Sequence, residues 1–414
     1  MEQRRVQFSP PDITEEEIQA VCETMRSGWI TTGPKTKQFE RELADYCAVR
    51  RAICLNSATA GLELVLRLFE IGEGDEVITT PYTYTATASV ILHTGAKIVF
   101  ADVLPGSFAI NPNAVAALIT EKTKAVIPVD VGGIPCDYDE LYNALEDKKF
   151  LYFPKKGTLQ EKLSRPLLLA DASHSLGAEY KSNGKWKKSG ALADFSVFSF
   201  HAVKNLTTAE GGAVTFNGSD NADAQKIYEQ LQLLSLHGQS KDAFAKMKAG
   251  NWRYSIELPG YKCNMTDIAA SMGLVQLKRY PNLLARRQEL FNLYKKNFCA
   301  NDKLILPAES ENFKSSYHIY ALRIQGADEI VRDKIIDQCA ENGISCNVHY
   351  IPLPMHPFYR SLGYKIENYP NAYNMYKNEI SLPLHTLMND EDINYVAQSI
   401  KSGLSFVDKS GSDF

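Results

Sequence analysis

The chain has 414 residues, with 45 Lys and Arg against 49 Asp and Glu, so its formal net charge is −4. Hydrophobic residues make up 44% and charged residues 23%, which is typical of a globular protein and excludes a disordered one. The mild acidic balance gives no electrostatic footprint for nucleic acid, and no apolar run approaches the ~18–20 residues that a membrane-spanning helix needs. We therefore expect neither nucleic acid nor a membrane as a partner.

The N-terminal residues turn polar and acidic where a secretory signal would carry its apolar stretch. The eight cysteines are scattered, with no CxxC pair and no spacing typical of metal ligands. In a chain of this length such cysteines indicate buried thiols in a reducing compartment. We expect a cytoplasmic protein without a metal site.

From about residue 50 onward, short apolar runs alternate with helical patterns. Continuous apolar strands separated by helices predict an α/β fold, with a mostly parallel, seven-stranded sheet covered on both faces. The predicted strands are 52–55, 76–79, 98–102, 125–129, 167–170, 195–200 and 212–216. The predicted helices between them are 60–69, 85–93, 115–119 and 137–145. Ligands of such sheets bind at the carboxyl ends of the strands.

After Gly260 the pattern changes. It predicts a helix over 265–280, an interruption at Pro281 and a second helix over 284–298. A strand at 318–324, a helix at 329–342, a strand at 345–350 and a helix at 389–401 follow. This order predicts a smaller α+β domain. We divide the chain into a large domain, 1–265, and a small C-terminal domain, 266–414, with a frayed tail at 408–414.

Two charged residues follow apolar strands of the predicted sheet. Asp171 ends the strand at 167–170, and Lys204 follows the strand at 195–200. A carboxylate at the end of a buried strand is costly without a cationic partner. The pair is therefore either a structural ion pair or part of a ligand site.

Two further strand ends favour the ligand site. The turn 56–61 (NSATAG) precedes a helix, and free N–H groups at a helix N-terminus together with the hydroxyls of Ser57 and Thr59 suit a phosphate. The alternative is an ordinary Ser/Thr N-cap. Tyr84, at a fourth strand end, offers an aromatic face, although such tyrosines often serve packing alone.

One cofactor explains all four features together. Pyridoxal phosphate (PLP) needs a phosphate site, an aromatic face, a lysine for its Schiff base and an acidic partner for its ring nitrogen. A carboxylate such as Asp171 keeps that nitrogen protonated through a charge-assisted hydrogen bond. An amine such as that of Lys204 loses its proton readily when desolvated and can then attack a carbonyl.

The chain resembles the DegT/DnrJ/EryC1/StrS family of sugar aminotransferases, which have the fold type I of the aspartate aminotransferase superfamily. The resemblance runs from about residue 8 to 405. Its motifs are TTGP from Thr31, NSATAGL from Asn56, TPYTYTATA from Thr80, DASHSLGAEY from Asp171, FSFHAVKNLTTAEGGAV from Phe198, GYKCNMTDIAASMGL from Gly260 and VHYIPLP from Val348.

The resemblance implies a role for each site residue. Lys204 would form the Schiff base and move the proton between cofactor and substrate. Asp171 would pair with the ring nitrogen, and His174 would approach the phenolic oxygen of the ring. The cofactor would also contact Tyr84, stacked on its face, and the phosphate-binding group Ser57, Ala58, Thr59 and Ser199. His201 belongs to the same motif, with packing beneath the lysine loop as its alternative role.

The resemblance also implies a homodimer in which each active site borrows residues from the partner. The borrowed segment matches 260–265, but Lys262 and Asn264 stand where many members have Asn and Arg. Asp130 stands where many members have His. The segment 147–166 is longer than usual and basic, and is either a solvated loop or a wall of the substrate pocket.

The implied reaction moves an amino group from L-glutamate to a nucleotide-linked sugar with a ketone at C4 or C3. Candidates for substrate contact are Tyr317, His318, His349 and Tyr350, with interior packing of the small domain as the alternative. Two other activities remain on the same scaffold. A dehydratase branch replaces the Schiff-base lysine with histidine, whereas this chain has Lys204. A non-catalytic PLP-binding regulator is the third possibility.

Overall fold

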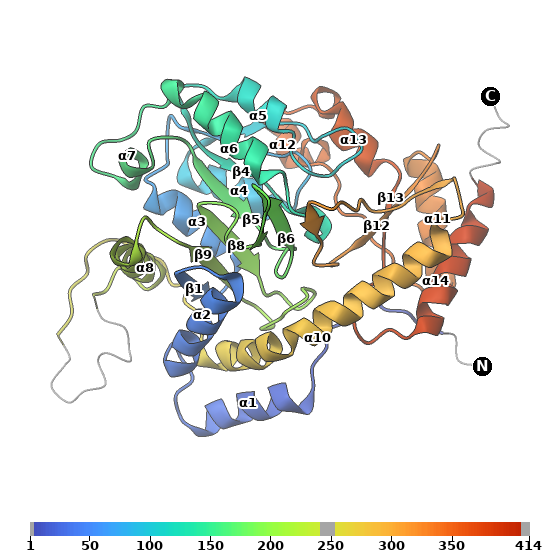
Figure 1. Cartoon of the computed structure of the whole chain (residues 1–414), viewed down its shortest axis with the longest axis horizontal. Helices are drawn as coiled ribbons and strands as arrows, with labels where there is room; N and C mark the ends of the chain where they lie inside the picture. The colour runs from blue at the N-terminus through green and yellow to red at the C-terminus, as the bar shows by residue number, and fades with distance from the viewer. Residues whose placement is uncertain (1–3, 241–252, 407–414) are drawn as a thin grey trace.

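A computed structural model of the chain describes residues 4–240 and 253–406, so the tail predicted at 408–414 lies outside the described residues. Its central element is a seven-stranded sheet in the order β1-β9-β8-β5-β4-β2-β3 (Figure 1). In this sheet β9 runs antiparallel to both its neighbours, and the other strands are parallel to one another. The strands are β1 (Arg51–Leu55), β2 (Glu76–Thr79), β3 (Lys97–Phe100), β4 (Thr123–Ile127), β5 (Leu167–Asp171), β8 (Phe195–Ser199) and β9 (Gly212–Phe216). The predicted mostly parallel α/β sheet is confirmed.

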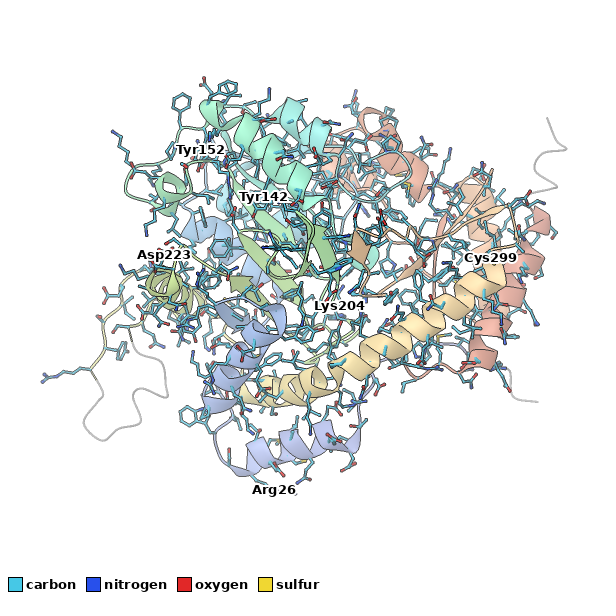
Figure 2. All side chains as sticks on the ribbon, in the orientation of Figure 1. Arg26, Tyr142, Tyr152, Lys204, Asp223 and Cys299 are labelled. Atoms are coloured by element: carbon cyan, nitrogen blue, oxygen red, sulfur yellow. The ribbon has the colours of Figure 1, made fainter. Side chains whose placement is uncertain are left out.

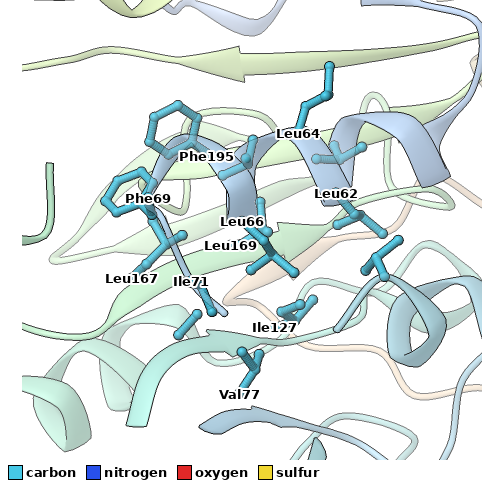
Figure 3. Close-up of a cluster of buried hydrophobic side chains, with 14 of the residues drawn as sticks. Leu62, Leu64, Leu66, Phe69, Ile71, Val77, Ile127, Leu167, Leu169 and Phe195 are labelled. Carbon is cyan, nitrogen blue, oxygen red and sulfur yellow. The ribbon is translucent and has the colours of Figure 1, made fainter. Parts of the chain in front are cut away.

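Helices cover both faces of this sheet, which is why β4 and β5 at its centre are buried along their whole length (Figure 1). In β5, Leu167 and Leu169 pack in one core and Leu168 and Ala170 in another, because successive side chains point to opposite faces. Figure 3 shows the first of these cores, with side chains of α3 over the strands. The covering helices are α3 (Ala58–Leu68), α4 (Thr85–Thr94), α5 (Pro112–Leu118), α6 (Tyr138–Asp147) and α8 (Asn221–Ser235).

A single long helix, α10 (Asp267–Phe298), replaces the two helices predicted around Pro281. The predicted interruption is wrong. Proline removes one backbone hydrogen bond, but apolar side chains on both sides of Pro281, such as Tyr280 and Leu290, are fully buried and hold the helix in place. The helix packs against α1 (Glu15–Arg26), α2 (Pro34–Cys47) and α14 (Asp390–Gly403), and so contacts elements of both predicted domains (Figure 1).

The C-terminal part contains a three-stranded sheet in the order β10-β12-β13, with α11 (Glu329–Glu341) and α14 beside it. Its strands are β10 (Leu304–Ile305), β12 (Tyr320–Ile324) and β13 (Glu379–Leu382). The strand predicted at 345–350 is wrong, because this segment makes one isolated bridge, from Asn347 to Ser381. The N–H of His349 donates to the side chain of Glu379 instead of to a strand. The division of the chain at residue 265 stays a prediction.

The remaining elements are short. No helix in the part of the chain that the structure describes combines the length and the apolar character needed to cross a membrane. A third sheet joins β11 (Phe313–Lys314), β6 (Glu179–Ser182) and β7 (Lys185–Lys188), and the short helices are α7 (Leu159–Leu163), α12 (Pro357–Ser361) and α13 (Pro370–Tyr376). Single 3₁₀ turns lie at Val131–Gly133, Lys149–Leu151, Leu353–Met355 and Ile366–Asn368.

Candidate active site

The carboxyl ends of the parallel strands meet at one edge of the large sheet, and the predicted site residues follow these ends. Asp171 is the last residue of β5, and Lys204 lies in the loop after β8, the strand next to β5. Figure 2 shows Lys204 near the centre of the molecule. The fold therefore brings the predicted amine and carboxylate to the same edge.

Asp171 is buried, with 5% of its surface exposed, and accepts hydrogen bonds from uncharged donors. Thr87 Oγ1 donates to Oδ2 at 2.7 Å, and the hydroxyl and N–H of Ser173 donate to Oδ1 at 2.5 and 3.2 Å. Among the residues that the structure describes, no cation lies within 4 Å of this carboxylate. A buried carboxylate without an ion pair leaves room for a cationic ligand such as a protonated ring nitrogen.

The Lys204 amine forms no hydrogen bond or ion pair with residues in the described ranges. Burial lowers the pKa of Lys204 to about 8, although the Asp171 carboxylate opposes this shift. About a tenth of the amine is then uncharged at pH 7, against less than about one in a thousand for an ordinary lysine, and the uncharged amine is the form that attacks a carbonyl.

The turn after β1 forms the N-terminus of α3. Ser57 is the N-cap residue, and its hydroxyl accepts the N–H of Ala60 at 3.1 Å. The N–H groups of Ala58 and Thr59 precede the first helical hydrogen bond and have no acceptor within the described residues. Such free N–H groups at the positive end of a helix suit a phosphate.

Gly212 shapes the same turn from the neighbouring strand. It lies between Leu55 of β1 and Ser199 of β8 in the sheet. A Cβ atom at Gly212 would lie 2.4 Å from the backbone nitrogen of Ala58, so a side chain here would fill the anion-binding turn. Because Gly212 has no side chain, the space between Ser199 and the N-terminus of α3 stays free for an anion.

His174 connects the turn after β5 to the C-terminal part of the chain. Its Nδ1 accepts the N–H of Gly132 at 3.2 Å, and its Nε2 lies 3.0 Å from the hydroxyl of Tyr350. Burial, with the charge of Lys204, lowers the pKa of His174 well below its ordinary value. A neutral His174 with Nδ1 as acceptor carries its proton on Nε2 and donates it to Tyr350, whose own hydroxyl proton is then free.

The loop before β12 contacts both the lysine loop and the His174 turn. Asn205 donates to the carbonyl of Ser316 at 2.7 Å and accepts from Nδ1 of His318 at 2.8 Å. The hydroxyl of Ser316 donates to the carbonyl of His174 at 2.5 Å. The rings of His174 and His318 lie 4.4 Å apart. This loop therefore joins the two halves of the site.

The other predicted substrate residues divide into two groups. His349 and Tyr350 lie beside His174, at ring separations of 6.4 and 6.0 Å. Tyr317 instead packs on Phe291 in the core of the C-terminal part, at 5.2 Å. Tyr84 is 62% exposed, and its ring lies 6.2 Å from that of Tyr350.

The segment 260–265 runs beside the anion-binding turn of its own chain. The N–H of Asn56 donates to the carbonyl of Cys263 at 2.8 Å, and Asn264 forms a bridge with Leu55. Lys262 is exposed, and its amine contacts the side chain of Asn264. Which chain's phosphate Lys262 and Asn264 reach stays a prediction.

His201 and Asp130 lie outside the set of groups that face the cofactor site. His201 does not pack beneath the lysine loop, because its ring is exposed, with Nε2 3.7 Å from Glu210. Asp130 supports the fold from a buried position, accepting from Ser175 and Tyr138 at 2.7 and 3.0 Å.

The segment 147–166 lies at the opposite edge of the sheet from Lys204. Gln160 donates to the carbonyl of Phe69 at the end of α3, and Arg165 pairs with Asp194 just before β8, at 2.7 and 2.8 Å. Phe69 and Asp194 both lie at the amino ends of the parallel strands. The segment therefore does not wall the site of its own chain.

Comparison with known proteins identifies the family. Residues 11–401 match the DegT/DnrJ/EryC1/StrS aminotransferase family. The chain belongs to this family. Spore coat polysaccharide biosynthesis protein SpsC of Bacillus subtilis is 38% identical over 97% of this chain and 98% of its own length.

Solved structures agree with the family assignment. A sugar aminotransferase described as putative, Spr1654 of Streptococcus pneumoniae, superposes in its pyridoxamine phosphate (PMP) form with a TM-score of 0.93 at 48% identity, covering 97% of this chain and 100% of that one. Helicobacter pylori PseC, an aminotransferase of pseudoaminic acid biosynthesis, superposes with a TM-score of 0.83 at 31% identity, covering 97% and 100%. A PLP form of Spr1654 is also known. The resemblance inferred from the motifs is confirmed, and so is the PLP cofactor of this aminotransferase family.

The described residues fit this cofactor. Asp171 has hydroxyl donors but no cation, the Lys204 amine is unpaired, and the turn beside Gly212 has two free N–H groups. The sequence did not single out Thr87, Asn205 and Ser316. Thr87 could have been found, because it lies in the motif TPYTYTATA that follows the strand β2. Ser316 is far away in sequence, and no local pattern indicates its contact.

The lowered pKa of Lys204 leads to a test on the enzyme without cofactor. Because the uncharged amine reacts with the aldehyde of PLP, the rate of covalent attachment should rise with pH and level off above a midpoint near 8. Stopped-flow absorbance after mixing apoenzyme with PLP measures this rate. A midpoint near the ~10.4 of an ordinary lysine would contradict the effect of burial.

Proposed function

We propose that this aminotransferase moves an amino group from L-glutamate to the C4 or C3 ketone of a nucleotide-linked sugar. The observation that carries the proposal is the amine of Lys204 and the carboxylate of Asp171 at the edge that also holds the anion-binding turn, where the described residues give the amine no partner and the carboxylate no cation. When bound, PLP accepts the amino group of one substrate and passes it to the next as PMP.

Each site residue has its own role in the proposed reaction. Ser57, Ala58, Thr59 and Ser199 would hold the phosphate group, and Asp171 would keep a proton on the ring nitrogen. The amine of Lys204 would take the proton from the substrate α-carbon and deliver it to the carbon on the other side of the amino nitrogen. Tyr84 would cover one face of the ring, and Nε2 of His174 donates to the hydroxyl of Tyr350.

The groups around the proposed substrate site are polar but uncharged. Burial lowers the pKa of His318 well below its ordinary value and that of His349 to about 4, so both are neutral at neutral pH. Neutral imidazoles and the hydroxyl of Tyr350 suit the hydroxyl groups of a sugar. The proposal also includes a homodimer in the reducing cytoplasm. In this dimer Lys262 and Asn264 of one chain would reach the active site of the other.

Separate half-reactions test this function. Glutamate alone should convert the PLP form into the PMP form, as measured by absorbance. A panel of 3-keto and 4-keto sugars linked to UDP, dTDP or GDP should then restore the PLP spectrum, with the same sugars lacking the ketone as controls. A dehydratase would consume a deoxysugar without stoichiometric glutamate, and a cofactor-binding regulator would do neither. Either result would overturn the proposal.

A further inference from the structure

A buried carboxyl group on β13 is connected to His349 by a chain of hydrogen bonds. Oε1 of Glu379 accepts the hydroxyl of Ser381 at 2.5 Å, and Ser381 Oγ lies 2.9 Å from Nδ1 of His349. Oε2 of Glu379 accepts the backbone N–H of His349 at 2.9 Å. Both Glu379 and Ser381 are completely buried.

The donors and acceptors in this series of hydrogen bonds have a defined order. When Glu379 is ionised, it can only accept, so the hydroxyl of Ser381 donates to it. Ser381 Oγ then accepts from Nδ1–H of His349, and Nε2 of His349 is left with its lone pair. Nε2 has no hydrogen-bond partner in residues 4–240 and 253–406, and the residue is partly exposed.

The ring of His349 is held in this orientation from several sides. Phe8 stacks on it at 5.6 Å, and the hydroxyl of Tyr82 donates to the His349 carbonyl at 2.8 Å. The next residue, Tyr350, contacts His174, and the charge of Lys204 contributes to the low pKa of His349. The open Nε2 therefore lies by the catalytic edge.

We propose that His349, Ser381 and Glu379 form a proton relay between the substrate pocket and a buried carboxyl group. The proton leaves the ammonium group of the amino donor and binds Nε2 of His349. The Nδ1 proton moves to Ser381 Oγ, and the hydroxyl proton of Ser381 moves to Oε1 of Glu379. No electrons are transferred, and the reverse sequence returns the proton to the amine product. The relay rests on the proposed aminotransferase function.

The surroundings of Glu379 support its role as the end of the relay. Burial raises the pKa of Glu379 to about 8, although Arg332 on α11 and Arg323 on β12 oppose the shift. The other titratable groups that interact with it are Tyr82, Tyr350 and Cys346. A carboxyl group with this pKa can gain and lose a proton near neutral pH, whereas His349 alone is too weak a base.

Glu379→Gln tests the order of donors and acceptors in this series of hydrogen bonds. The backbone N–H of His349 cannot be reversed, so the amide oxygen must stay beside it, and the amide NH₂ must face Ser381. Ser381 then donates to Nδ1 of His349, which moves the imidazole proton to Nε2. Histidine-selective ¹⁵N NMR at pH 9, assigned with His349→Gln, should show Nδ1–H in the wild-type holoenzyme and Nε2–H in Glu379→Gln.

Kinetics supply the second measurement. Glu379→Gln and Ser381→Ala should each slow the glutamate half-reaction at pH 9 by about 10²-fold. Glu40→Gln is the control, because Glu40 is also buried and accepts one backbone N–H, from Cys54, and one hydroxyl, from Tyr228, in addition to an ion pair with Lys37 at 3.5 Å. It should leave both the tautomer and the rate unchanged.

The outcomes are distinct. An unchanged tautomer in Glu379→Gln overturns the relay, and so does a changed tautomer with a glutamate rate within threefold of wild type. Failure of every keto-sugar to react with the PMP form would instead overturn the proposed substrate. That result leaves the relay standing, because the relay is measured with glutamate alone.

Discussion

Lys204→Ala should abolish the visible absorbance of the bound cofactor and lower the rate of transamination by at least about 10⁴-fold. The amine of Lys204 has no partner in the described structure, and burial lowers its pKa to about 8, so it is set up to react and not to stabilise the fold. Absorbance spectra and single-turnover rates with glutamate measure both effects.

The control for this variant is another buried lysine. Lys124 donates to the carbonyls of Glu121 and Phe153 at the opposite edge of the sheet, and burial also lowers its pKa. Lys124→Ala should cost stability but keep the spectrum and the rate per folded molecule. If Lys204→Ala kept both the yellow colour and the turnover, the assigned role would be refuted.

Asp171→Ala should lower turnover by about 10²–10³-fold, because it removes the charge that keeps the ring nitrogen protonated. The lost charge-assisted hydrogen bond is worth about 1.5–3 kcal/mol, so PLP should also bind about 10–100-fold more weakly. Equilibrium dialysis of PLP and single-turnover absorbance measure the two losses. Asp171→Asn keeps the shape of the side chain and should show the same losses.

Asp130→Asn separates this effect from general damage at the strand ends. Asp130 is buried next to Asp171 in the fold, and the N–H of Asp130 donates to the carbonyl of Asp171. Because the donors to its side chain among the described residues, such as Ser175 and Tyr138, are neutral, its loss should lower stability and not turnover per folded molecule. Wild-type turnover in Asp171→Asn would show that the ring-nitrogen contact is wrong.

The large sheet could be predicted because its strands are buried on both faces. Continuous apolar runs as short as β5 are typical of strands in such a sheet, and the bounds predicted for β2 and β9 agree with the structure. The small sheet was harder to predict. β13 carries Glu379 and Ser381, and nothing in the local pattern indicates that these polar side chains are buried. The helix across Pro281 depends on packing that only the folded chain provides.

The candidate site was predictable where it follows strand ends. Asp171, Lys204 and the turn at Ser57 could be placed by topology alone, because parallel strands gather their carboxyl ends. The contacts made by the C-terminal part could not be predicted, because Ser316 and His174 form a hydrogen bond although they lie more than a hundred residues apart in the sequence. The sequence offered Tyr317 and His318 together, and the structure separates them by placing one ring in the core and the other beside His174.

The continuity of α10 has a consequence for how this chain can change over evolution. A loop between domains can gain or lose residues at little cost, but each residue added within a helix turns everything beyond it by about 100°. One extra residue in α10 would rotate His318 and His349 away from Lys204. Insertions of about seven, eleven or eighteen residues would keep the angular phase to within about 20°, and even the shortest of these would separate the two parts by about 10 Å. The length of this one helix is therefore as constrained as the identity of the residues around the cofactor.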